Sequence, residues 1–271
     1  MSTADRVAPP NYLLADQPAE LDRLRRQALA WEPAGRALLA EVAAPISARA
    51  LDLGCGALGW LRLLSEWVGP EGRVIGTDID ASLLDAARHF CGEERLGRVT
   101  LLRDDLFASD LEPASFDLVH ARFQIAPLGR SDEIVDTMLR LVRPGGLLIL
   151  EDPVADSWRF QPPAPATDEL VQHIIEAFTR AGGCFDAGPH NVQLLRRRGL
   201  AVTVRAAVLA LQPDDPYLRL PLQFAAGLRH SLADHLGDDR LEDLLARAAH
   251  EIEEPTRWGL SFTLVQAVAR A

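Results

Sequence analysis

The sequence contains no lysine, so all 28 of its Lys-or-Arg positions are arginines. This absence excludes chemistry that needs a lysine amine, namely Schiff-base catalysis, a pyridoxal phosphate site and a Walker-type phosphate loop. Cysteine is also scarce, and the three residues Cys55, Cys91 and Cys184 show neither zinc-ligand spacing nor a disulfide framework. We therefore expect no metal site, and a chain suited to a reducing compartment.

Long apolar runs and net positive charge are absent as well. No run approaches the roughly 18 apolar residues of a membrane span, and residues 1–17 lack the apolar core of a signal peptide. The formal net charge is -11, whereas a protein that grips nucleic acid needs a basic surface to neutralise phosphates. We therefore expect a cytoplasmic protein with neither a membrane nor a nucleic-acid partner.

What the sequence does contain is an alternation of short apolar runs with amphipathic segments. The expected strands are Ala48–Leu53, Arg73–Thr77, Val99–Leu102, Phe116–His120 and Leu147–Leu150. The expected helices between them are Leu58–Trp67, Leu83–Phe90 and Asp132–Leu141. Strands that alternate with helices at this spacing predict parallel βαβ units and an α/β, doubly wound sheet.

The flanks of this alternation have a different pattern. Ala19–Val42 has helical periodicity, and Pro33 is expected to split it into two helices. Beyond Asp152 the pattern predicts a helical insertion and two strands, Ala201–Leu211 and Ser261–Val268. We divide the chain into an N-terminal helical cap (1–45), a core (46–155), and substrate-side helices with a closing β-hairpin of the same domain (156–271).

A glycine-rich turn follows the first expected strand, in Leu51-Asp52-Leu53-Gly54-Cys55-Gly56-Ala57-Leu58-Gly59. Such a turn lets a ligand approach the backbone closely, with amide groups pointing at it. Asp78 closes the second expected strand, 24 residues after Gly54, where a carboxylate can accept both hydroxyls of a ribose. These two features also fit a nicotinamide-binding fold, and the glycines alone fit a plain tight turn.

Three further features separate these possibilities. Asp52 stands two residues before the first glycine, where a dinucleotide site more often carries an apolar residue. Asp104-Asp105-Leu106 follows the third expected strand, where a carboxylate could take an adenine amino group, and Arg143-Pro144-Gly145-Gly146 precedes the fifth as a helix-stop turn. Together with the glycine turn, these motifs resemble the class I SAM-dependent methyltransferases of the small-molecule, UbiE-like type over Ala48–Asp152.

This resemblance implies a Rossmann-like, seven-stranded sheet whose last strand is antiparallel. It also implies S-adenosyl-L-methionine (SAM) as cofactor and S-adenosyl-L-homocysteine (SAH) as its product. It further implies that the methionine end of SAM is contacted by Gly54, Cys55, Gly56 and the backbone at Ala121. The ribose would be contacted by Asp78, and the adenine by Ile79, Asp105 and Leu106. The N-terminal flank resembles the cap of enzymes that act on small metabolites, and it adds Tyr12 and Gln27 as expected cofactor contacts.

The sequence also departs from parts of this family. The aspartate-proline-proline-aromatic motif of nucleobase N-methylation is missing, and so is the paired-glutamate loop of protein arginine methyltransferases. Both absences favour a small-molecule acceptor. The segment Gln124–Leu128 lacks the histidine that many relatives carry after the fourth strand.

Candidate catalytic residues lie at the expected carboxyl ends of strands. Methyl transfer from a sulfonium is an in-line displacement that depends mainly on positioning, so no rigid catalytic constellation is expected. His120 is a candidate base or substrate contact, with a histidine serving only its own turn as the alternative. Either Asp152 or Glu151 is a candidate facing the acceptor, with helix capping or a surface pair as the alternative. Candidate substrate contacts, each with a structural alternative, are Arg122, Trp158, His190 and Tyr217.

The leading hypothesis is a SAM-dependent enzyme that methylates oxygen, nitrogen or carbon of a small metabolite. The alternative is a methyltransferase-fold protein that catalyses a non-methylating cyclisation or rearrangement. A nicotinamide oxidoreductase and a non-catalytic partner subunit are weaker possibilities, and the sequence leaves a homodimer open.

Overall fold

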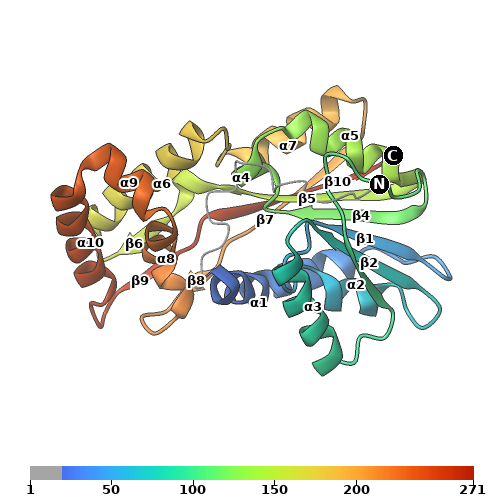
Figure 1. Cartoon of the computed structure of the whole chain (residues 1–271), viewed down its shortest axis with the longest axis horizontal. Coiled ribbons are helices and arrows are strands. Elements are labelled where there is room, and N and C mark those ends of the chain that lie inside the picture. Colours follow the sequence, from blue (N-terminus) through green and yellow to red (C-terminus); the bar gives the residue numbers. More distant parts are fainter. Residues whose placement is uncertain (1–19) are drawn as a thin grey trace, which may run out of the picture.

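The computed structural model describes residues 20–271 and places a seven-stranded sheet at its centre (Figure 1). The strand order is β3-β2-β1-β4-β5-β10-β7. The expected Tyr12 contact lies outside the described residues. The strands are β1 (Arg49–Leu53), β2 (Arg73–Asp78), β3 (Val99–Arg103), β4 (Phe116–Arg122), β5 (Val142–Val154), β7 (Val202–Ala207) and β10 (Thr263–Arg270).

The last strand runs antiparallel to its neighbours, as predicted. β10 lies between β5 and β7 and pairs antiparallel with both, whereas β1 to β5 pair in parallel. The family-type sheet and its closing strands are therefore confirmed. Because parallel strands end at the same edge, the loops after β1, β2, β3 and β4 are brought together there.

One expected turn is wrong. Residues 143–146 were expected to form a helix-stop turn before the fifth strand, but α5 (Ser131–Leu141) ends earlier and β5 begins at Val142. Gly145 has a φ of +76°, and the register of β5 against β4 shifts between Phe116 and Leu118. The glycines thus form an irregular start of the strand, because Gly145 adopts a conformation that other residues rarely reach.

Helices cover both faces of the sheet (Figure 1). The helices α1 (Glu20–Leu39), α2 (Leu61–Trp67) and α3 (Ala81–Glu93) lie on one face, and α4 (Ile125–Leu128), α5 and α7 (Ala187–Arg197) lie on the other.

The expected break at Pro33 is wrong, since α1 is a single helix with this proline inside it. A Cβ at Gly35 would lie 2.8 Å from Leu63 and 2.9 Å from Trp60, so α1 packs tightly on the α2 region. Trp31, on the same helix, is fully buried. This tertiary packing outweighs the backbone hydrogen bond that proline removes.

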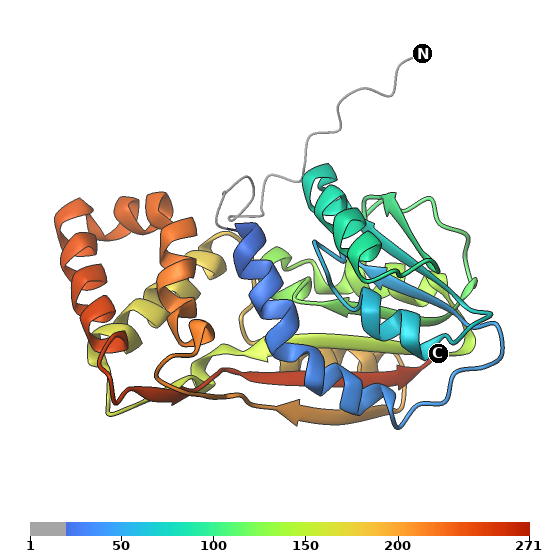
Figure 2. The same cartoon turned by 90° about the horizontal axis from the view of Figure 1, so that it is seen from below.

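A helical lobe extends beyond the carboxyl edge of the sheet, with α1 lying between it and α3 (Figure 2). It contains α6 (Pro165–Arg180), α8 (Leu220–Gly227), α9 (Arg229–Leu236), α10 (Asp238–Ile252) and the short helices η1 (Ala155–Ser157) and η2 (Pro216–Arg219). A second sheet that the sequence pattern did not predict, β6-β9-β8, lies at its base (Arg159–Gln161, Trp258–Leu260, Ala210–Leu211). Among the helices within residues 20–271, none is long and apolar enough to cross a membrane.

Candidate active site

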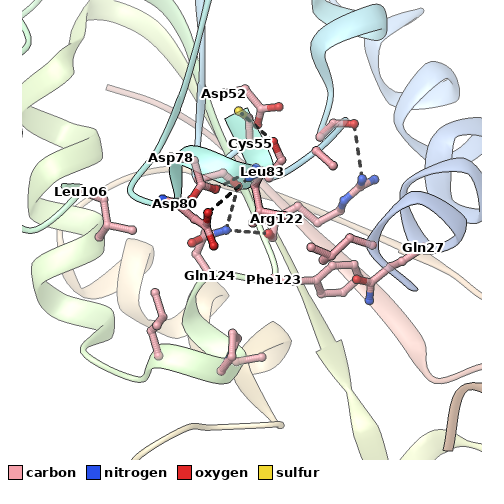
Figure 3. Close-up of a pocket in the computed structure, with 18 of the residues that line it drawn as sticks. Gln27, Asp52, Cys55, Asp78, Asp80, Leu83, Leu106, Arg122, Phe123 and Gln124 are labelled. Atoms are coloured by element: carbon pink, nitrogen blue, oxygen red, sulfur yellow. Dashed lines mark hydrogen bonds between the residues drawn. The ribbon is translucent and has the colours of Figure 1, made fainter. Parts of the chain in front are cut away.

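A cavity of about 210 Å³ lies at the carboxyl edge of the large sheet, between the strand ends and the helical lobe (Figure 3). One end is lined by the turn after β1, by the end of β2 and its turn, and by residues 104–107 after β3; we call this the glycine-loop end. The other is lined by five phenylalanines, two arginines and a glutamine; we call this the phenylalanine end. The cavity therefore brings the sequence-predicted cofactor motif together with the start of the lobe.

The conformation of the glycine loop, residues 54–59, is fixed by side chains packed against it. A Cβ at Gly59 (φ +47°) would collide with the Asp52 carboxylate, and one at Gly54 (φ +70°) would collide with the Gln124 side chain. Gly56 (φ +55°) has no atom within 4 Å of a Cβ placed there. The loop is thus packed on its inner side and open at Gly56.

Asp78 ties this loop to the end of β2. One of its oxygens accepts the Gly56 N–H at 2.9 Å, and the other accepts the Asp80 N–H at 2.9 Å. Burial raises the pKa of Asp78, although these backbone hydrogen bonds partly oppose the rise. Cys55 joins the two strands as well, since its N–H donates to the Thr77 carbonyl at 2.7 Å.

The turn after β3 supplies the remaining lining of this end. Ile79, Asp105 and Leu106 all line the cavity, as the resemblance implies for adenine contacts. Asp105 accepts the Phe107 N–H at 2.9 Å and so shapes its own turn. A buried oxygen of the neighbouring Asp104, Oδ2, has no hydrogen-bond partner among residues 20–271. The orphaned acceptor in this turn therefore belongs to Asp104 rather than to Asp105.

A buried row of polar side chains crosses the sheet beneath the loop. We call Asp52, His120, Glu151 and Gln266 the polar row; they come from β1, β4, β5 and β10 and are 0–2% exposed. His120 contacts Asp52 at 2.8 Å through Nδ1 and Glu151 at 3.1 Å through Nε2. Gln266 donates to Glu151 at 2.6 Å, and the Trp60 N–H donates to Asp52 at 2.6 Å.

His120 fits the protonated state in this row. Burial alone would lower its pKa, but the charge of Asp52 and the hydrogen bonds to Asp52 and Glu151 outweigh burial and raise it. Its ring also stacks on Trp60, with the ring centroids 3.9 Å apart. Both ring nitrogens are therefore engaged with carboxylates, although His120 lines the cavity as expected of a ligand-edge residue.

The phenylalanine end is built from scattered segments. Its five rings come from the residue after β4, from α6, from the α6–α7 turn, from α8 and from the turn before β10: Phe123, Phe178, Phe185, Phe224 and Phe262. Ring-to-ring contacts with centroid separations from 4.4 to 6.3 Å join Phe178, Phe185 and Phe224 to one another, and Phe123 to Phe262. Phe123 has a φ of +54°, and its N–H donates to the Glu151 carbonyl at 2.8 Å. A non-glycine residue held there stores backbone strain at the cavity wall.

Two arginines border these rings. Arg23 lies 4.8 Å from the Phe224 ring centroid and is ion-paired with Glu20 at 2.7 Å. Arg122 lies 5.7 Å from the Phe123 ring centroid. Gln27, an expected cofactor contact, lines the cavity and accepts from Arg23 at 3.2 Å.

Several expected site residues do not line the cavity. Asp152 is fully buried and accepts from the Ala126 N–H at 3.0 Å and from the Asn191 amide at 2.8 Å. Burial raises the pKa of Asp152 to about 7. Both of its oxygens therefore hold neighbouring helices, α4 and α7, and its expected role toward the acceptor stays a prediction. Ala121 is likewise buried within β4 and absent from the lining.

Three of the four expected substrate contacts are also elsewhere, and only Arg122 lines the cavity. Trp158 packs in the lobe core against Phe262 at 5.3 Å, and Tyr217 accepts from the Trp31 indole at 2.8 Å. His190 bonds to the Ser131 hydroxyl at 2.9 Å. These three side chains make core or helix contacts, and their expected contact with a substrate stays a prediction.

A separate cluster lies on the surface of the lobe. His173 and Glu176 of α6 and His235 of α9 have potential metal-ligand atoms within 4.8 Å of one another. The sequence pattern gave no metal spacing because the third member comes from another helix. Glu176 also lies 3.9 Å from Arg180, so an ion pair competes for this carboxylate.

Comparison with known proteins identifies the core. Residues 50–146 match the family model described as a methyltransferase domain. The demethylmenaquinone methyltransferase of Lactococcus lactis subsp. lactis (strain IL1403) is 32% identical over 99 residues, which are 36% of this chain and 39% of that protein. The chain thus spans about two fifths of the length of this curated relative.

Solved structures extend the likeness of fold to most of the chain. The YcgJ protein of Bacillus subtilis has a TM-score of 0.59 at 18% identity, covering 88% of this chain and 99% of that one. The cyclase SpnF has a TM-score of 0.50 at 18% identity, covering 87% and 79%. The predicted resemblance to methyltransferases is thus confirmed for the core segment, residues 50–146.

Proposed function

We propose that the protein transfers the methyl group of SAM to oxygen, nitrogen or carbon of a small, apolar metabolite. The observation that carries this proposal is the two-sided cavity, in which the motif of a methyltransferase domain faces a wall of phenylalanines. The net charge of -11 supports a small molecule rather than a nucleic acid as the acceptor.

Three features of the glycine-loop end fit SAM. Gly56 leaves open space where other residues carry a Cβ, so a ligand can approach the backbone. Asp78 presents a buried carboxylate at the cavity, suited to two ribose hydroxyls. The unpartnered Asp104 oxygen calls for a donor, which an adenine amino group can supply.

The proposed roles follow from this fit. Gly54, Cys55 and Gly56 hold the methionine end, Asp78 holds the ribose, and Ile79 and Leu106 pack on the adenine. When bound, SAM would supply an electrophilic methyl group for in-line transfer, with SAH as the leaving group. The chain's own contribution is to exclude water with the phenylalanine wall and to hold the acceptor in position.

Among residues 20–271, no carboxylate that lines the cavity lies at the phenylalanine end, where the acceptor would bind, to take a proton from it. Both nitrogens of His120 are bonded to carboxylates, and both oxygens of Asp78 accept backbone N–H groups. The reaction therefore rests on positioning, and the acceptor atom must already be nucleophilic when it binds.

The first experiment is calorimetric titration of SAH and of NAD into the wild type, Asp78→Ala and Asp85→Ala. Asp85 is an exposed aspartate of α3 outside the cavity lining, and it serves as the matched control. We expect SAH to bind the wild type and Asp85→Ala equally, and to bind Asp78→Ala about 10- to 100-fold more weakly, because hydrogen bonds to a charged group are lost. Binding of NAD but not of SAH would refute the proposal.

A second experiment separates methylation from the alternative, a cyclisation or rearrangement on the same fold. SpnF shares the fold, so the fold alone does not distinguish the two reactions. Incubation with methyl-labelled SAM and a panel of apolar phenols, amines and enols should move the label to an acceptor. Tight SAH binding together with no labelled product from any acceptor would favour the alternative.

A further inference from the structure

The two ends of the cavity differ in charge. The aspartates among its described lining residues all belong to the glycine-loop end: Asp52, Asp78, Asp80, Asp104 and Asp105. The lining groups beside the phenylalanines are Arg23, Arg122 and Gln27, without a carboxylate among the described residues there. The residues that line this end therefore present guanidinium groups and no carboxylate, and one of these groups, that of Arg23, is ion-paired with Glu20.

The Arg122 guanidinium has a donor nitrogen that no described residue satisfies. Its side chain is 7% exposed, and its Nη2 donates to the Gly59 carbonyl at 3.5 Å. Its Nη1 has no hydrogen-bond partner in the described part of the chain and lies 3.9 Å from Glu151. Glu151 is already bonded to His120 and Gln266. A buried guanidinium N–H without a partner is costly, so this atom suits an oxygen that a ligand brings.

The direction of this side chain favours the acceptor over the cofactor. In Figure 3 the Arg122 guanidinium lies on the side of Gln27 and Phe123, away from Asp78 and Leu106. Its position over the Phe123 ring places the charge at the edge of the phenylalanine end. An anionic group on an aromatic ring can reach Nη1 while its ring lies among the phenylalanines.

We infer that the acceptor is an aromatic acid (a phenol, an enol or a carboxylic acid on a flat ring) that binds as its anion against Arg122. This inference rests on the proposed methyl transfer, and it accounts for the missing base in the cavity lining. A guanidinium beside a hydroxyl favours its ionised form, so the proton leaves to solvent water on binding. An acceptor carrying an ammonium group is disfavoured, because it would face the Arg122 guanidinium and no carboxylate among the described lining residues of this end.

The test uses probes that share one ring and differ in charge. Titration calorimetry on SAH-saturated protein compares 2-naphthol, 2-naphthoate and 2-naphthylmethylammonium. We expect the first two to bind at least about tenfold more tightly than the ammonium probe. Binding of 2-naphthol should also release a proton, measured as a difference in heat between buffers of low and high ionisation enthalpy. Equal or tighter binding of the ammonium probe, or no proton release, would overturn the inference.

Variants locate the effect at Arg122. Arg122→Gln should lower the affinity for 2-naphthoate about tenfold or more, and Arg122→Lys should keep part of the wild-type affinity. The control is Arg143→Gln, a surface residue paired with Asp117, which should bind 2-naphthoate as the wild type does. Each variant is also titrated with SAH and with 5′-methylthioadenosine, which lacks the amino-acid carboxylate. If Arg122→Gln weakened only SAH and left the naphthoate preference intact, Arg122 would serve the cofactor and the inference would be wrong.

Failure of the proposed function gives a different result. Wild-type protein that did not bind SAH would refute the cofactor assignment before any probe was added. Protein that bound SAH normally but did not prefer the anionic probes would refute the inference alone.

Discussion

The glycine-loop end and the phenylalanine end of the cavity are built in different ways. The first uses backbone groups and short carboxylates from three turns at neighbouring strand ends, with the polar row beneath them. The second uses the tips of five large side chains from segments spread between residues 123 and 262. The backbone conformation of the glycine-loop end is fixed by many neighbouring groups at once. At the phenylalanine end, by contrast, one side chain can be replaced without moving the others. We therefore expect substitutions at the glycine-loop end to lower both stability and cofactor affinity. Substitutions at the phenylalanine end should lower the affinity for the acceptor.

The largest expected effect is on stability, from replacing His120 by leucine. This change leaves the carboxylates of Asp52 and Glu151 buried without their shared cation, which typically costs about 3–5 kcal/mol of unfolding free energy. The measurement is urea unfolding at neutral pH. A loss below about 1 kcal/mol would show that the polar row does not support the glycine loop.

The same variant should change the pH dependence of stability. The pKa of His120 is raised in the folded protein, so folding takes up a proton there. Its contribution is complete below the ordinary pKa of histidine and is lost as the pH rises through the raised folded value. The wild type should therefore lose stability as the pH rises from the ordinary histidine pKa through the raised one, and His120→Leu should lack this component of the slope.

Next in size is the contrast between two glycines of one loop. In Gly59→Ala the new residue must adopt a positive φ, and its Cβ would also collide with Asp52. We therefore expect the free energy of unfolding to fall by about 2–3 kcal/mol. Gly56→Ala meets open space, so only the positive φ should cost stability, about 1 kcal/mol, while its new methyl group blocks SAH. Unfolding and SAH titrations on both variants measure the difference. Equal stability losses would contradict the packed and open sides of the loop.

A smaller effect should separate the two ends directly. Phe185→Ala removes a half-buried ring of the phenylalanine end, and Phe107→Ala removes one of the glycine-loop end. Each should cost about 1–2 kcal/mol of stability, less than a fully buried phenylalanine. We expect Phe185→Ala to lower the affinity for an apolar acceptor about tenfold and to leave the affinity for SAH unchanged. Phe107→Ala should lower the affinity for SAH about tenfold and leave the affinity for the acceptor unchanged. Loss of both affinities in both variants would mean that the ends are not independent.

The same contrast explains what the sequence could predict. The five parallel strands and the glycine turn are contiguous patterns, and Asp78 stands at a fixed distance from that turn, so local spacing carried the information. The phenylalanine wall was not predicted as a unit, because its members meet only after the lobe folds over the sheet.

Other differences have specific physical causes. Pro33 was expected to break α1, but packing at Gly35 and Trp31 keeps the helix whole. The strands of the small sheet are two or three residues long, too short for an alternating pattern. Asp152 sits at a ligand-side strand end, as a catalytic group would, but its two donors come from α4 and α7, and no sequence spacing reveals them.

The smallest expected effect concerns His190, a residue at the start of α7 that was expected to touch substrate. Its hydrogen bond to Ser131 joins α7 to α5, and His190→Ala should cost about 0.5–1 kcal/mol of stability through loss of that bond alone. SAH and acceptor affinities should stay within about twofold of the wild type, since His190 is absent from the described cavity lining. Titration of both ligands checks this, with Ser131→Ala as the partner control. If His190→Ala weakened the acceptor while Ser131→Ala did not, the phenylalanine end would have to extend to α7, and its boundary with the sheet core would need to be redrawn.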